Sequence, residues 1–434
     1  MDLSAFYFKD LLDFTAHWWQ GVFVFTAHWW WIFVPIILFR FMYDIWMYDV
    51  GARYHTEYEY AILAIRVPRE EERSPKLMEN VLHGFWTLYG NVRNFMDTLV
   101  LGIKPDYASL EIIGTEGKIY YGARLLADKV DFFKSHIYSQ YPEAEIEVLK
   151  EDYLDLVPNN AIGNGWKAWG TVFAPSKNDA YPIRTYSEFQ DSVTGTMVDP
   201  IASYMEVLSD LGPGEFIWYQ LLMEPVKAHV WYDEAQQEVE RILDRGKYRE
   251  KNVLGKQIMK DFLSFPKETL QAAFKYPEDT FSKEDDKISP MLKLSPGEQD
   301  SLKAIERNIS KRSFRSQYSA VYIAREENFK SKNISSMMGA VNQFATNDLN
   351  ELEMYKPYLT SSNYWFTDKR NDYAKRRLLK IMKRRQFTGK SYILNTEEIA
   401  SLWHFPDVSV KAPQTPRVAA KKISAPTNLP TRSN

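Results

Sequence analysis

The chain contains no cysteine among its 434 residues. Disulfide bonds, thiolate nucleophiles and metal sites with cysteine ligands are therefore excluded, and redox chemistry gives no indication of the cellular compartment. The seven histidines include no pair at the three- or four-residue spacing that places two metal ligands on one helix face. The sequence accordingly predicts no metal site, no cofactor and no catalytic residue.

A strong excess of charge of either sign is also lacking. The formal net charge is -3 and the isoelectric point is near 6.2, which gives no global case for binding nucleic acid or an anionic surface. The apolar content of 45% is enough for one large core or two modest ones. Charge must therefore be examined segment by segment.

One long apolar run is present, at residues 21–39, and it carries no formally charged side chain. Its length matches the roughly 20 residues that a helix needs to cross a bilayer, so residues 1–50 are predicted to be a membrane anchor with one transmembrane helix. Several arginines follow the run, whereas Lys9 alone precedes it, which predicts that the bulk of the chain faces the cytoplasm. A cleaved signal peptide fits less well, because the run ends without small residues.

Hydrophobic periodicity predicts an α+β fold. In the first half of the folded region, strands are expected near residues 57–68, 108–113, 118–124 and 144–149, and helices at 75–95 and 127–140. These elements follow the β-α-β-β-α-β order of a ferredoxin-like unit. In the second half, strands are expected at 168–174, 215–225 and 318–325, and helices at 200–211 and 296–310. We therefore expect two ferredoxin-like halves, at 51–160 and 161–368, with a charged insertion at about 231–295.

The sequence of the last part of the chain predicts a strand, a short helix and a tail. Ser391–Asn395 has strand character, Thr396 is expected to cap the next helix, and Pro406 should end it. Leu402, Trp403 and Phe405 form an apolar face that we interpret as a partner-docking surface. Residues 411–434 have the Pro-punctuated composition of a flexible tether.

A second candidate surface lies within residues 369–390, which are densely cationic and have helical periodicity. This stripe could be a solvated helix face, a surface for an acidic partner or anionic lipid, or a contact for nucleic-acid phosphates. The cations of the predicted basic surface are Arg376, Arg377, Lys380, Lys383 and Arg384.

Thr388–Tyr392 (TGKSY) matches only the end of a phosphate-binding loop. The full pattern requires glycine where the chain has Arg384, and the loop should open a helix rather than precede a strand. The sequence therefore does not predict nucleotide binding here.

Several segments resemble a known family. SPKLMENVLHGFW at 74–86, SLEIIGTEGKIYYGARL at 109–125, DPIASYMEVLSDLGPGEFIWYQLL at 199–222 and the SYILNTEEIASLWHFP stretch at 391–406 look like the non-motor region of membrane-anchored ATPases of type IV secretion and conjugative DNA transfer. The resemblance implies a bacterial inner-membrane location, an assembly role beside a P-loop ATPase, contact with membrane lipid, and possible homo-oligomers. It carries no catalytic signature.

The leading hypothesis is a non-catalytic, membrane-anchored assembly or scaffold subunit of a type IV secretion or DNA-transfer machine that positions a P-loop ATPase. The alternative is a membrane-tethered protein that binds nucleic acid, such as DNA, through the basic helix at 369–390. An enzyme with a site that the sequence does not disclose is the third class.

Overall fold

The computed structural model describes residues 31, 34–47, 49–50, 58–67, 74–88, 106–189, 198–227, 231–243, 294–361, 367–388, 390–408 and 410. The chain divides into two compact units, of which the first comprises residues 1–59 and 90–105 and the second comprises 60–89 and 106–434. The sheet, the helices that cover it and both candidate surfaces belong to the second unit.

The expected single-pass membrane location is contradicted. Across the described ranges, no helix combines the length and the apolar character that crossing a bilayer requires. Residues 21–30, 32 and 33, which form most of the predicted span, lie outside the described residues.

The α+β class is confirmed, with a sheet whose strands are paired antiparallel. Within the described residues nine strands form one sheet in the order β4-β1-β3-β2-β6-β7-β5-β8, and β9 pairs with β7 beyond the end of β5. The strands are β1 (Tyr60–Arg66), β2 (Ala108–Thr115), β3 (Lys118–Leu126), β4 (Glu145–Leu149), β5 (Trp166–Pro175), β6 (Glu215–Val226), β7 (Ser313–Arg325), β8 (Leu352–Met354) and β9 (Tyr392–Asn395).

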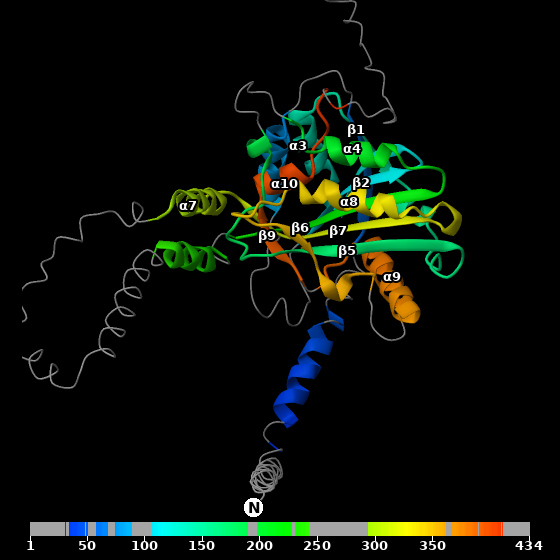
Figure 1. Ribbon diagram of the computed structural model, residues 1–434, viewed down its shortest axis with the longest axis horizontal. Coiled ribbons are helices and arrows are strands. Elements are labelled where there is room, and N and C mark those ends of the chain that lie inside the picture. The colour runs from blue at the N-terminus through cyan, green and yellow to red at the C-terminus, as the bar shows by residue number, and fades with distance from the viewer. Residues whose placement is uncertain are drawn as a thin grey trace, which may run out of the picture. The chain divides into compact units, whose positions relative to one another are not determined.

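Helices cover the two faces of this sheet unequally. Figure 1 shows α3, α4, α8 and α10 on one side of the strands and α9 on the other. The α-helices are α2 (Lys76–Phe85), α3 (Val130–Gln140), α4 (Ala202–Ser209), α7 (Pro296–Ile309), α8 (Ser331–Asn342), α9 (Thr367–Arg384) and α10 (Thr396–Leu402). Residues 232–243 are also helical.

The core follows the alternation of the strands. Ile217, Tyr219 and Leu221 of β6 lie in the large cluster beneath α2, α3, α4, α8 and α10, whereas Phe216 and Trp218 lie in the smaller cluster beneath α9. Because successive strand residues point to opposite faces, β6 is buried along its whole length.

Two runs of elements share one arrangement. In the first run, β1-α2-β2-β3-α3-β4, the strands lie in the order β4-β1-β3-β2, and in the second, β5-α4-β6-β7-α8-β8, they lie in the order β8-β5-β7-β6. The two runs join where β2 pairs with β6 from Ala108↔Met223 to Thr115↔Phe216.

One element of the second run differs from the prediction. We expected the helix at 296–310 to complete it, but the α-helix that follows β7 is α8, and α7 lies between the predicted insertion and β7. A capping box begins α7: the Ser295 hydroxyl accepts the N–H of Glu298, and the Glu298 carboxylate accepts the N–H of Ser295 at 2.9 Å.

Candidate nucleic-acid-binding surface

Helix α9 is cationic on one side and packed on the other. Its sequence contains eight lysines and arginines and two aspartates, in a chain whose overall charge is negative. Leu378, Leu379 and Met382 are buried and pack with Ala168 and Val172 of β5. The charged side chains are therefore held on a rigid element rather than on a loop.

A glycine in β5 allows this close packing. A Cβ atom on Gly170 would lie 2.6 Å from the carbonyl oxygen of Ala320 and 2.8 Å from a methyl carbon of Leu378. Neither distance is compatible with a real side chain, so only glycine permits α9 to approach the sheet at this point.

Four of the five predicted cations are exposed, namely Arg376, Arg377, Lys380 and Arg384. Arg376, Lys380 and Arg384 recur every four residues, which places them on one stripe with about 6 Å of rise between neighbours. We call these four residues the α9 basic face.

Lys383 is not part of this face. Its ammonium group donates to the carbonyl oxygen of Val157 at 2.5 Å and to the side-chain oxygen of Asn159 at 2.9 Å, and it lies 3.3 Å from the Asp155 carboxylate. Its assignment to the basic surface was wrong, because the 155–159 segment, which is remote in sequence, covers it.

A groove continues the basic face toward the start of α9. It has a volume of about 730 Å³ and lies between α9 and the short helix η10 (Lys356–Tyr358). The described residues that line it include four cations and no carboxylate; the cations are Lys356, Lys369, Arg370 and Arg377. The positive charge of the described lining favours a negatively charged ligand.

Tyrosines stand beside these cations. The Arg377 guanidinium donates to the hydroxyl of Tyr358 at 2.7 Å and lies 4.2 Å from the centre of its ring. Tyr358 in turn donates to the carbonyl oxygen of Thr388 at 3.0 Å. Tyr373, which also lines the groove, is 70% exposed.

The role of the residue that follows α9 was missed in the sequence. Arg385 has a backbone φ of 52°, is 1% exposed, and turns its side chain inward although it follows the exposed Arg384. Its Nε atom donates to Glu111 of β2 at 2.6 Å, and its other nitrogens donate to both oxygens of Asp152. Gln220 of β6 donates to the same Glu111 carboxylate at 3.1 Å. No local signal distinguished Arg385 from Arg384.

The surroundings of Arg385 shift the pKa values of Asp152 and Tyr153. Burial by itself would raise the pKa of the Asp152 carboxyl, but the hydrogen bond and charge of Arg385 hold it below its ordinary value. Burial and the neighbouring Glu111 raise the pKa of the Tyr153 hydroxyl well above its ordinary value. The Arg385 side chain therefore ties the end of α9 to Glu111 of β2 and to Asp152.

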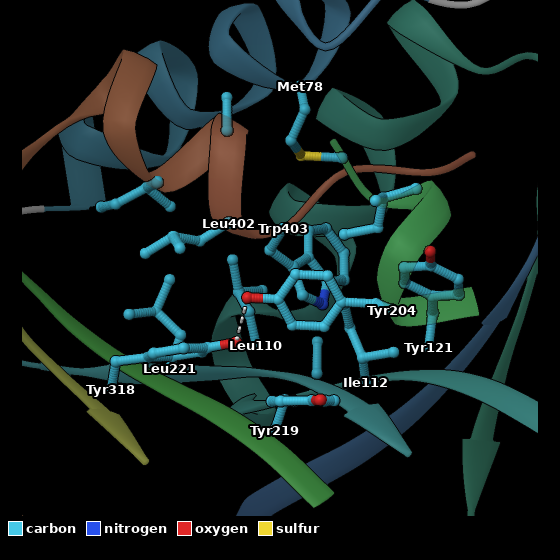
Figure 2. Close-up of a cluster of buried hydrophobic side chains, with 14 of the residues drawn as sticks. Met78, Leu110, Ile112, Tyr121, Tyr204, Tyr219, Leu221, Tyr318, Leu402 and Trp403 are labelled. Carbon is cyan, nitrogen blue, oxygen red and sulfur yellow. Dashed lines mark hydrogen bonds between the residues drawn. The ribbon is translucent and has the colours of Figure 1, made fainter. Parts of the chain in front are cut away.

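The predicted docking residues lie inside the protein. Leu402, Trp403 and Phe405 are 1%, 1% and 2% exposed. Figure 2 shows Leu402 and Trp403 within a cluster that also contains Met78 of α2 and Tyr121 of β3. The Trp403 indole donates to the carbonyl oxygen of Glu111 at 3.1 Å, and the rings of Phe405 and Tyr141 are 4.9 Å apart. The prediction of an exposed docking surface is therefore corrected, because α10 completes the core of its own chain.

The cap of α10 also differs from the prediction. Asn395, not Thr396, is the N-cap: its side chain accepts the N–H of Glu398, and Glu398 accepts the N–H of Asn395, both at 2.8 Å. Thr396 is the first helical residue. Next to it, Lys311 lies 2.6 Å from the carboxylates of both Glu397 and Glu79, which ties α10 to α2.

The remaining chemical motifs have structural roles. Thr388 donates to Gln317 through both its N–H and its hydroxyl, and the segment leads into β9 rather than a helix, so it lacks the context of a phosphate loop. The buried ring of His404 lies 2.8 Å from Asp199 and 2.7 Å from the carbonyl oxygen of Ala400. Among the residues that the structure describes, no group of three histidine, aspartate or glutamate side chains is arranged to hold a metal ion.

No protein-family model matches the chain, and the comparison with curated proteins found no match.

Proposed function

We propose that this chain is a non-catalytic subunit of a type IV secretion or DNA-transfer machine that contacts nucleic acid through the α9 basic face. The observation that carries the proposal is the exposure of Arg376, Arg377, Lys380 and Arg384 on one packed helix. Contacts of lysine and arginine with phosphates supply most of the affinity in sequence-independent binding.

The groove beside α9 supports the same proposal. Its cations extend the positive charge along the helix, and Tyr358 and Tyr373 offer aromatic rings at its wall. Cationic grooves with exposed aromatic side chains are typical of proteins that bind nucleic acids without strict sequence preference.

We also propose that the two runs of strands and helices are ferredoxin-like halves. Each has the β-α-β-β-α-β order along the chain, and its strands lie in the sheet in the order fourth, first, third, second. The insertion between β6 and β7 interrupts only the second run. Joined through β2 and β6, the two halves form one continuous sheet, and α9 packs on it.

Positioning a P-loop ATPase is the assembly role that the family resemblance implies. The contact was first assigned to Leu402, Trp403 and Phe405, but these side chains are buried in the core of this chain. Within this proposal, an ATPase partner must therefore contact another surface.

The test measures DNA affinity by fluorescence anisotropy between roughly 50 and 200 mM salt. The variant replaces Arg376, Lys380 and Arg384 by glutamine. We expect weaker binding to all sequences and a slope of log affinity against log salt that is shallower by about 3, because each lost phosphate contact releases about one counterion fewer.

A matched control replaces three exposed lysines on other helices by glutamine, namely Lys76, Lys303 and Lys332. This variant has the same net charge and should retain the wild-type slope. Equal losses in both variants would show that only net charge matters, and binding of an acidic protein but not of DNA would overturn the nucleic-acid proposal.

A further inference from the structure

Strand β4 forms one edge of the sheet. Among the described residues it pairs only with β1, from Ile62↔Leu149 to Arg66↔Glu145. Its other edge therefore presents backbone N–H and carbonyl groups that no described strand uses. Such an edge is a template for one more strand.

The two faces of β4 have opposite chemistry. Val148 and Ile146 lie opposite Leu63 and Ile65 of β1, whose side chains belong to the helix-covered core. Ile146 packs partly against that core, and Val148 is 47% exposed. On this face of β4, the apolar core therefore extends to the edge of the sheet and is partly exposed.

The other face is acidic. Glu145 and Glu147 alternate with the apolar residues and are exposed. Glu147 lies 3.2 Å from Arg66 of β1, and its side chain remains 58% exposed. An added strand would therefore place alternate side chains beside carboxylates.

Charge argues against a second copy of β4 as the added strand. A symmetric antiparallel pair centred on Glu147 places Glu147 opposite itself, and one centred on Ile146 places Glu145 opposite Glu147. Like charges directly opposite each other destabilise a strand pair. A strand with basic residues at those positions makes each contact favourable instead.

We infer that the β4 edge binds an extended segment of a partner protein in which lysine or arginine alternates with apolar residues. The segment adds a strand to the sheet, its basic side chains face Glu145 and Glu147, and its apolar side chains cover Ile146 and Val148. This surface is separate from the α9 basic face and does not depend on the proposed nucleic-acid contact.

The test uses the full chain and a short fluorescent peptide of alternating lysine and valine, with binding measured by anisotropy. A variant with Glu145→Lys and Glu147→Lys should bind about tenfold more weakly, since two favourable cross-strand charge pairs become repulsive. The matched control reverses Glu143 and Glu151, two exposed glutamates that flank β4 without belonging to it, and should bind nearly as the wild type does.

A second measurement leaves the protein unchanged. Two versions of the peptide carry N-methyl groups on alternate residues, in opposite phase. Strand addition predicts that one version loses binding and the other keeps it, because only one set of N–H groups faces β4. Equal binding by both versions, or by a peptide whose lysines and valines are grouped in separate blocks, would overturn the inference.

Sedimentation of the wild-type chain completes the test. A monomer in the absence of peptide is expected. A dimer that the Glu145→Lys and Glu147→Lys variant abolishes would show that a second copy occupies the edge, and would equally overturn the inference.

Discussion

At the scale of single residues, Arg385 anchors the end of the basic helix. Its side chain is buried between Glu111 and Asp152, and its backbone φ is positive at the point where the chain leaves α9. A buried ion pair adds little net stability by itself, but removing one partner leaves an uncompensated charge in the core. Arg385 is therefore a positioning residue for α9.

The first prediction concerns this residue. We expect Arg385→Ala to lower the free energy of unfolding by about 3 to 5 kcal/mol, because Glu111 is left buried without its cation. Urea denaturation measures the change. The neighbouring variant Arg384→Ala removes an exposed side chain and should change the free energy by no more than about 0.5 kcal/mol. Similar losses in the two variants would show that the network does not stabilise the fold.

At the scale of elements, α10 packs into the large core cluster on the side of the sheet that most helices cover. All seven of its residues are buried, and the side chains that follow it reach Tyr121 and Tyr141. Figure 2 shows that Trp403 lies between residues of the sheet and of α2. The C-terminal helix is thus a structural part of the fold.

The second prediction separates this structural role from a docking role. We expect Trp403→Ala to destabilise the protein by about 3 to 5 kcal/mol, because it opens a cavity in a packed core. Thermal unfolding followed by circular dichroism measures the loss, and Val408→Ala, at a residue 49% exposed, is the control. An unchanged melting temperature in Trp403→Ala would contradict the buried position.

At the scale of the whole molecule, the sheet crosses the boundary predicted near residue 160. The pairing of β2 with β6 runs over eight residue pairs, and Trp403 of the C-terminal segment donates to Glu111 in β2. Contacts of this kind couple the stability of the two halves.

The third prediction follows from this coupling. We expect scanning calorimetry to show one transition for the sheet, with calorimetric and van't Hoff enthalpies in agreement. Ile65→Ala, a core truncation in β1, should shift that whole transition to lower temperature. Two transitions, of which Ile65→Ala moves only one, would indicate independent domains instead.

Local sequence signals determined much of the secondary structure. The apolar run of β6, the periodicity of α9 and the turn at Glu116 and Gly117, both of which have positive φ, depend on neighbours within a few residues and were predictable. The α+β class followed from the order of these elements.

Only the tertiary structure decided which side chains are exposed. The apolar face of α10 and the cationic face of α9 were both visible in the sequence, but periodicity does not say whether a face meets the chain's own core, a partner or water. Glu111 and Arg385, which form one ion pair, are 274 positions apart, and Lys383 is covered by a segment more than 220 positions away. Burial depends on such long-range contacts. They bury α10 and Arg385 and cover Lys383, whereas the α9 basic face stays exposed.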